Sequence, residues 1–309
     1  MSRTPYENLP PERFWKHGVA AAGSAAPPNL YRRKWAIKKR DRIATAGSCF
    51  AQHIGRELKN GGFHLLDLEP APVPLPEGRH PAYGYSIYSA RYGNIYTTRQ
   101  LLQIAREAFE GFVPSELAWE KQGRYFDCFR PGVEPVGLSS PQEVEDHRRY
   151  HIDCVRKLFL SMDVFVFTLG LTECWMKRVS GDVYPTVPGS IAGRFDPALY
   201  EFKNFTFREV YEDILRFREV VTAARDGRSF RMLLTVSPVP LTATASSRHV
   251  LQATVYSKSV LRSVAGQLES EFDEIDYYPS YEIITHPWAD RDSSRPASAT
   301  FRPQASLSR

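Results

Sequence analysis

One short segment limits what this chain can fold into more than any other part of its sequence. Asp163–Leu169 reads DVFVFTL, and its residues after the aspartate are almost wholly apolar and mostly β-branched or aromatic. Such a run is typical of a strand buried on both faces of a parallel sheet. Further strands are expected at Ile43–Ala46, Phe63–Leu68, Met232–Val236 and Ile275–Tyr278.

Helical segments separate these strands. Apolar residues follow helical spacing over Phe50–Leu58, Arg99–Phe109 and Val250–Leu268. Two further helices are expected to begin at capping boxes, Ser140…Glu143 and Thr206…Glu209. Strands that alternate with helices of this length predict an α/β domain whose mainly parallel sheet is covered on both faces.

The chain is expected to have three parts. Residues 1–41 carry scattered proline and basic residues without a sustained period, which predicts an extended lead-in to a domain at 42–288. Residues 289–309 are rich in Ser, Arg, Pro and Ala, so we expect this tail to be disordered. With 42% hydrophobic and 24% charged residues, the composition is that of an ordinary globular protein.

Charge and apolar runs exclude several classes of partner. A net charge of +5 over 309 residues gives no reason to expect nucleic acid as a partner. The longest apolar stretch, around Val164–Met176, is interrupted by polar residues and glycine, so no membrane span is predicted. The N-terminus lacks the apolar region of a secretory signal, and the four cysteines form no CxxC pair. We therefore expect a cytoplasmic protein that needs neither a metal nor a cofactor.

The chemistry is expected where the first strand turns into its helix, at Gly47-Ser48-Cys49. A glycine permits a sharp turn, and the residues after it lie at a helix N-terminus, where unpaired N–H groups stabilise negative charge. A thiol there can become a thiolate at neutral pH, and the same N–H groups can bind an oxyanion. The alternatives are that Ser48 only caps the helix and that Cys49 is a small buried apolar residue.

Several longer strings carry a family resemblance: GSCFA at 47–51, YSARYGNIYT at 88–97, FTLGLTECW at 167–175, TVSPVPLTATAS at 235–246 and YSKSVLR at 256–262. On these strings the chain resembles the GSCFA domain family, which is itself similar to the SGNH/GDSL hydrolase superfamily. The resemblance runs from about Tyr6 to Trp288. It implies a flavodoxin-like three-layer α/β/α sandwich.

The resemblance also implies a nucleophile and part of an oxyanion hole. The superfamily's Gly-Asp-Ser motif falls on Gly47-Ser48-Cys49, so Cys49 takes the nucleophile position and Ser48 stands where the superfamily has aspartate. We keep Ser48 as the alternative nucleophile. The oxyanion glycine of the second motif falls on Gly93, and Asn94 follows it.

The third motif, Gly-x-Asn-Asp, falls on Gly170-Leu171-Thr172-Glu173. Thr172 then offers a hydroxyl in place of the oxyanion asparagine, and Glu173 keeps an acid. A turn that starts a helix after the strand would explain Thr172 and Glu173 equally well.

The last motif, Asp-x-x-His, is matched only in part. His286 has Ile283 where the aspartate is expected. His249 is the preferred base, because it follows a strand's carboxyl end and precedes a helix. His53, one helical turn beyond Cys49, is a third candidate. For each of them a structural or surface histidine is the alternative.

Two residues are candidate substrate contacts. Tyr92 belongs to a tyrosine-rich stretch that can line a sugar or acyl cleft or pack beneath a loop. Lys258 can bind a carboxylate or phosphate or lie on a helix surface. The sequence predicts an acyl-ester hydrolase or acyltransferase for a small-molecule or glycan ester, such as an acylated carbohydrate. The alternative is a catalytically inactive binding module of the same fold.

Overall fold

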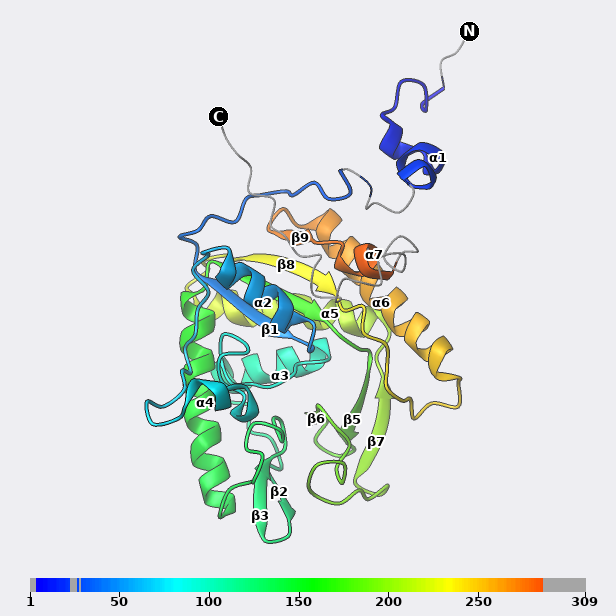
Figure 1. Cartoon of the computed structure of the whole chain (residues 1–309). Helices are drawn as coiled ribbons and strands as arrows, with labels where there is room; N and C mark the ends of the chain where they lie inside the picture. The colour runs from blue at the N-terminus through cyan, green and yellow to red at the C-terminus, as the bar shows by residue number, and fades with distance from the viewer. Residues whose placement is uncertain (1–3, 23–26, 28, 286–309) are drawn as a thin grey trace.

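The computed structural model describes residues 4–22, 27 and 29–285, and a parallel sheet lies at its centre (Figure 1). Within these residues the sheet has four strands in the order β1-β4-β8-β9, and all neighbours are parallel. The strands are β1 (Ile43–Gly47), β4 (Val164–Leu169), β8 (Arg231–Val236) and β9 (Ile275–Tyr277). The four corresponding predictions from the sequence are confirmed.

The strand expected at Phe63–Leu68 does not form, and this prediction is wrong. Leu65 makes a single parallel bridge to Ile43 on the free side of β1. The chain then leaves the sheet, because the Leu68 N–H turns to the Ser89 carbonyl. When the bridging segment is counted as the second strand along the chain, the five segments lie across the sheet in the order 2-1-3-4-5. This is the flavodoxin-like order.

Helices cover both faces of the sheet, as predicted, and make a three-layer α/β/α sandwich. One face carries α2 (Ala51–Asn60), with Ile284 of α7 (Ser280–Thr285) packed beside it. The other face carries the four remaining long helices, α3 (Thr98–Phe109), α4 (Pro141–Ser161), α5 (Phe207–Ala224) and α6 (Val250–Glu271).

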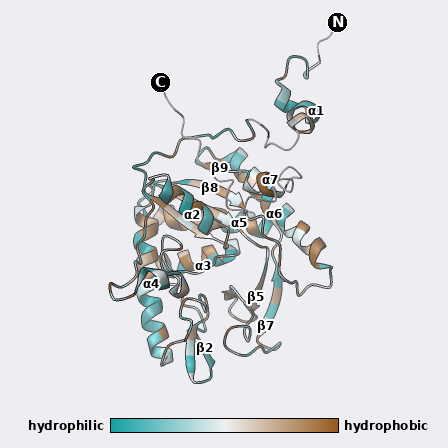
Figure 2. Ribbon diagram, in the orientation of Figure 1, coloured by the Kyte–Doolittle hydropathy of each residue, from teal (hydrophilic) through white to brown (hydrophobic). Residues whose placement is uncertain are grey.

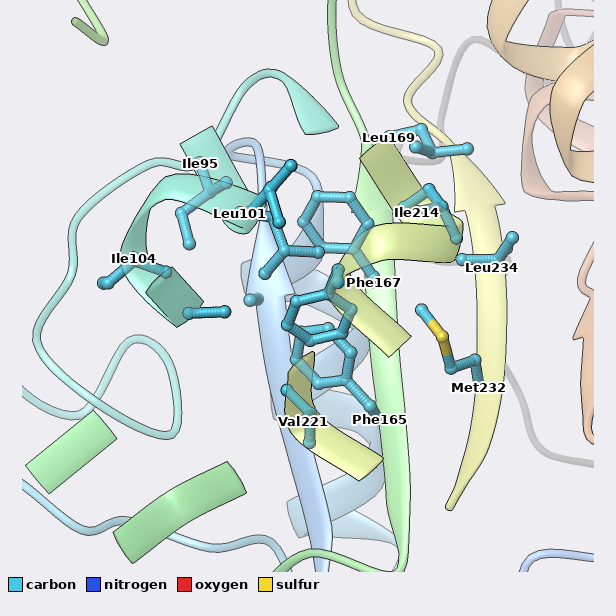
Figure 3. Close-up of a cluster of buried hydrophobic side chains, with 14 of the residues drawn as sticks. Ile95, Leu101, Ile104, Phe165, Phe167, Leu169, Ile214, Val221, Met232 and Leu234 are labelled. Atoms are coloured by element: carbon cyan, nitrogen blue, oxygen red, sulfur yellow. The ribbon is translucent and has the colours of Figure 1, made fainter. Parts of the chain in front are cut away.

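The alternation of side chains along β4 divides the core between these faces. Phe165, Phe167 and Leu169 point into the larger cluster, beside residues of α3, α5 and β8 (Figure 3). Val164 and Val166 point the opposite way, toward α2. In Figure 2, apolar residues gather where helices meet the sheet, whereas α4 is hydrophilic along much of its length. Both faces of β4 are therefore fully buried.

Capping fixes where two of the helices begin, as the sequence predicts. The Thr206 hydroxyl accepts from the Glu209 N–H, and the Glu209 carboxylate accepts from the Thr206 N–H, a complete capping box at α5. At α4 the Ser140 hydroxyl accepts from the Glu143 N–H, but the Glu143 carboxylate accepts from Ser139 instead. The second bond of the predicted capping box therefore comes from the N–H of Ser139 instead of that of Ser140.

Two small antiparallel sheets lie beyond the central sheet, and β5 of one of them follows the carboxyl end of β4 (Figure 1). The sequence did not predict these antiparallel strands, and Glu173, where a helix start was the alternative, opens β5 instead. Their mutual packing is aromatic, with Trp175 of β5 against Phe202 of β7. The strands are the hairpin β2 (Ala118–Lys121) and β3 (Arg124–Asp127), and the sheet of β5 (Glu173–Lys177), β6 (Val183–Tyr184) and β7 (Tyr200–Asn204).

Short helical turns and irregular segments complete the described chain. The lead-in holds η1 (Pro11–Arg13), α1 (Trp15–Gly18) and η2 (Ala20–Ala22), and two turns, η3 (Glu77–Arg79) and η4 (Pro81–Tyr83), precede the site. Trp35 and Ile37 of the lead-in pack on the α2 side of the core. The expected disordered tail at 289–309 lies outside the described residues. Among the helices described, none has the length and apolar character to cross a membrane.

Gly47 is the position where a side chain would be least tolerated. Its φ is +139°, and an added Cβ would lie 2.5 Å from the Thr168 carbonyl oxygen. Gly47→Ala should therefore lower the free energy of unfolding by at least about 2 kcal/mol, from backbone strain and steric overlap together. Urea unfolding measures this loss. Gly132→Ala is the control, because an added Cβ there meets nothing within 4 Å; equal loss in both variants would contradict the prediction.

Candidate active site

The candidate site lies at the carboxyl ends of β1 and β4, where the chain changes from one face of the sheet to the other. The chain leaves β1 for α2 on one face and returns to β4 from α4 on the opposite face. In open α/β sheets, such a switch point leaves a crevice in which ligands bind. The motifs at Gly47–Cys49 and Gly170–Glu173 both follow these two strands.

The segment Asn94–Tyr96 joins the two strand ends. The Ile95 N–H donates to the Gly47 carbonyl at 2.9 Å, and the Leu171 N–H donates to the Tyr96 carbonyl at 2.8 Å. Gly170 lies so close that an added Cβ would be 2.9 Å from the Tyr96 oxygen. The three predicted motif segments therefore meet in space.

Cys49 and Ser48 differ sharply in accessibility. Cys49 is an exposed free thiol, whereas Ser48 is 3% exposed and its hydroxyl oxygen has no hydrogen-bond partner among the described residues. The expected alternative of a buried apolar Cys49 is therefore wrong. An exposed thiol at the switch point can reach a substrate, and a buried serine hydroxyl cannot do so without a rearrangement.

The turn at Cys49 leaves main-chain donors free. The N–H groups of Ala51, Gln52 and His53 bond to carbonyls of the preceding turn. The N–H groups of Cys49 and Phe50 form no hydrogen bond within the described part of the chain. They lie just before α2, at the end of the helix that favours negative charge. They can hold an oxyanion beside the sulfur.

Tyrosine hydroxyls and an amide form a hydrogen-bond network beside the Cys49 turn. The Tyr88 hydroxyl donates to the Asn94 side-chain oxygen at 2.6 Å, and the Asn94 amide donates to the Tyr96 hydroxyl at 3.0 Å. Burial raises the pKa of both tyrosines, and negative charge on Cys49 raises it further. Asn94, predicted as an oxyanion residue, is thus tied into a network that faces Cys49.

Lys258 places a buried amine beside the strand ends of the site. It is 1% exposed, and its Nζ donates to the Gly170 carbonyl at 2.7 Å. Burial lowers its pKa to about 8, and the negative charge of Cys49 opposes that shift. Lys258 forms no ion pair with a carboxylate within the described residues. The alternative of a surface lysine is therefore wrong.

Thr172 and Glu173 are both buried, and each is held by a neighbouring segment. The Thr172 N–H donates to the Ser257 hydroxyl at 3.0 Å, while its own buried hydroxyl has no partner among the described residues. A Glu173 carboxylate oxygen accepts from the Thr244 hydroxyl at 2.9 Å, and burial raises the pKa of this carboxyl. The amide of Thr172 is occupied, so only its hydroxyl remains as a donor.

The described histidines do not pair with the thiol. His249 is exposed and caps α6, with its Nδ1 accepting from the Leu251 N–H at 3.2 Å. His53 packs on the Phe50 ring, and burial lowers the pKa of its imidazole. Neither ring forms a hydrogen bond with Cys49. His286 lies outside the described residues, which also hold no His, Cys, Asp and Glu grouping suited to a metal ion.

Tyr92 is a packing residue in this structure, contrary to its predicted role as a substrate contact. It is 2% exposed, and its hydroxyl donates to the Thr45 carbonyl. With Asn94 it lines a cavity of about 20 Å³, which holds little more than one water molecule.

Gly93, the predicted oxyanion glycine, directly precedes Asn94. Its φ is +67°, and its N–H has no partner within the described residues.

Sequence comparison identifies this arrangement at the level of a family. The model of the GSCFA family matches residues 42–297, which is most of the chain. No curated protein and no solved structure matches the chain.

The buried ammonium of Lys258 should cost stability at neutral pH. Lowering its pKa from the usual 10.5 to about 8 corresponds to about 3 kcal/mol, and loss of the bond to Gly170 offsets about 1 kcal/mol of this. Lys258→Met should therefore be about 2 kcal/mol more stable than the parent at pH 7. From pH 8 to 10.5 the unfolded parent keeps a proton that the folded parent has lost, so parent stability rises and this difference shrinks.

Denaturant unfolding at several pH values measures the difference. Lys121→Met is the matched control, since Lys121 also donates to a carbonyl, that of Ile191, but from the exposed surface. Replacement of this exposed lysine should change stability by less than about 0.5 kcal/mol at pH 7. A Lys258→Met variant less stable than the parent at pH 7, or a difference constant with pH, would contradict the prediction.

Proposed function

Because this chain belongs to the GSCFA family and presents Cys49 at the switch point of its sheet, we propose that it is an acyl-ester hydrolase or acyltransferase. The observation that carries the proposal is an exposed thiol beside two unpaired main-chain N–H groups, those of Cys49 and Phe50. A thiol nucleophile with oxyanion donors within one turn is the arrangement that acyl transfer requires.

In the proposed reaction the Cys49 sulfur attacks the ester carbonyl carbon. The oxygen becomes negative and is held by the N–H groups of Cys49 and Phe50, with Gly93 and Asn94 on the facing segment. Each such donor contributes about 10²–10³-fold to the rate in comparable sites. Loss of the alcohol leaves a thioester on Cys49, which water or an acceptor hydroxyl then attacks.

The surroundings of Cys49 favour a small, polar ester. Two tyrosine hydroxyls and the Asn94 amide offer hydrogen bonds beside the thiol, as an acylated carbohydrate would require. All four cysteines are free thiols, which supports a reducing, cytoplasmic setting in which Cys49 stays reactive. The predicted catalytic roles of Glu173 and of His249 as the base stay part of the sequence-based proposal, but Glu173 bonds to Thr244 and His249 caps α6 in this structure.

The proposal predicts a covalent acyl group on Cys49. Incubation with p-nitrophenyl acetate should release a burst of nitrophenolate and add one acetyl group to the Cys49 peptide, detected by mass spectrometry. Neutral hydroxylamine should remove the group, because thioesters react with it far faster than oxygen esters do. Cys49→Ala should abolish both the burst and the label.

Ser48→Ala is the matched control, because Ser48 is the adjacent nucleophile and its hydroxyl has no partner. This variant should keep the label on Cys49. An acyl group found on Ser48 would reverse the assignment of the nucleophile. If no ester or acyl thioester labels the protein, while Cys49→Ala still binds an acylated sugar, the protein is the alternative binding module.

A further inference from the structure

Resting on the thioester mechanism above, we propose that Lys258, rather than a histidine, accepts the proton of Cys49 and returns it to the leaving group. The pairing of a buried lysine with an exposed cysteine at the switch point carries this inference. Lys258 comes from α6, far from Cys49 in the sequence, and its bond to Gly170, which packs against Ser48, places it beside the Cys49 turn.

A buried lysine without a carboxylate needs a reason to be there. Desolvating an ammonium is costly, and buried charges are normally paired. Within the described residues Lys258 has one hydrogen-bond acceptor, the Gly170 carbonyl, and the charge that acts on it comes from Cys49. An ammonium has three donors, so the bond to Gly170 leaves capacity for a second partner.

The bond to Gly170 also places the amine. Gly170 packs against both Ser48 and the Tyr96 carbonyl, so its own carbonyl is fixed relative to the Cys49 turn. A lysine held by this carbonyl has its nitrogen buried behind the carboxyl end of β4 rather than in solvent. The anchor therefore orients Lys258 as well as satisfying one donor.

The titratable groups around this pair leave Lys258 as the suitable proton acceptor. Cys49 lies on the β1–α2 turn, and Tyr88 and Tyr96 lie beside this turn in the loop before α3, where the Tyr88 hydroxyl also bonds to the Ser48 carbonyl. Burial raises the pKa of both tyrosines, so they stay neutral and protonated. Burial lowers the pKa of Lys258 to about 8, so part of it is a free amine near neutral pH.

The proton balance of the reaction follows. Neutral Lys258 takes the Cys49 proton as the S–C bond forms, and the carbonyl oxygen becomes an oxyanion. When the C–O bond of the ester breaks, the Lys258 ammonium protonates the departing alkoxide, giving an alcohol and the neutral amine. In the second half, water or an acceptor hydroxyl gives its proton to Lys258 as it attacks, and the proton returns to the Cys49 sulfur as the C–S bond breaks.

Esters with different leaving groups test this role. Nitrophenolate departs without a proton, whereas the ethoxide of ethyl acetate needs one. Lys258→Met should slow acylation of Cys49 by ethyl acetate about 100-fold or more at all pH values. Acylation by p-nitrophenyl acetate should fall at pH 7 but recover above pH 9, because hydroxide then replaces the lost base.

Lys258→Arg provides a second variant, which keeps the charge and a donor to Gly170 but does not release its proton. It should show the same selective loss with ethyl acetate. Lys121→Met should acylate like the parent. Equal losses with both esters at all pH values would show that Lys258 is only structural, and a parent-like rate with ethyl acetate in either Lys258 variant would also overturn the proposal.

Failure of the proposed function is separable from failure of this inference. If the parent protein forms no acyl-Cys49 with either ester, the rate of Cys49 alkylation by iodoacetamide at pH 7 still tests the pair. Lys258→Met should then alkylate more slowly than Lys121→Met and the parent, because Cys49 has lost its proton acceptor. Equal alkylation rates in the three proteins would overturn the pairing itself.

Discussion

The close approach of β1 and β4 at their carboxyl ends is the constraint on which the site depends. No side chain fits at Gly47 or Gly170, because the facing backbone lies within 3 Å of where a Cβ would be. That approach lets the Asn94–Tyr96 segment bridge both strand ends and holds Cys49 above them. The GSCFA motif therefore specifies backbone geometry as well as the position of the proposed nucleophile.

Burial of Lys258 joins the stability of the fold to its chemistry. An amine in water has a pKa near 10.4 and is almost fully protonated at neutral pH, so it is a poor proton acceptor. Burial brings the value to about 8, so part of Lys258 is an unprotonated amine near neutral pH and can accept the proton that the proposed mechanism requires. The desolvation of Lys258 thus lowers the stability of the folded state and, in the proposed mechanism, makes its amine a better proton acceptor.

Local patterns predicted the fold well and its irregular parts poorly. The apolar run at Val164–Leu169 and the capping box at Thr206 depend on neighbours in sequence, and the structure confirms both. Phe63–Leu68 has strand composition, but only Leu65 reaches the sheet before the chain turns toward Ser89. The strand at Glu173–Lys177 depends on pairing with β7, and the residues around it in the sequence do not indicate that pairing.

The site, too, could be predicted only in part from neighbours in sequence. The sequence predicts Cys49 on its turn, but the tertiary bond between Lys258 and Gly170 decides which charged group lies beside that turn. A local signal for Lys258 did exist, since it shares the helical face of Leu261, Ala265 and Leu268, which are all buried. A charged residue on an apolar face is rarely accidental, because the fold must either satisfy it or use it. At the position of His249, by contrast, a helix cap already uses one ring nitrogen. The buried lysine Lys258 is therefore a candidate base that the histidine motifs do not indicate.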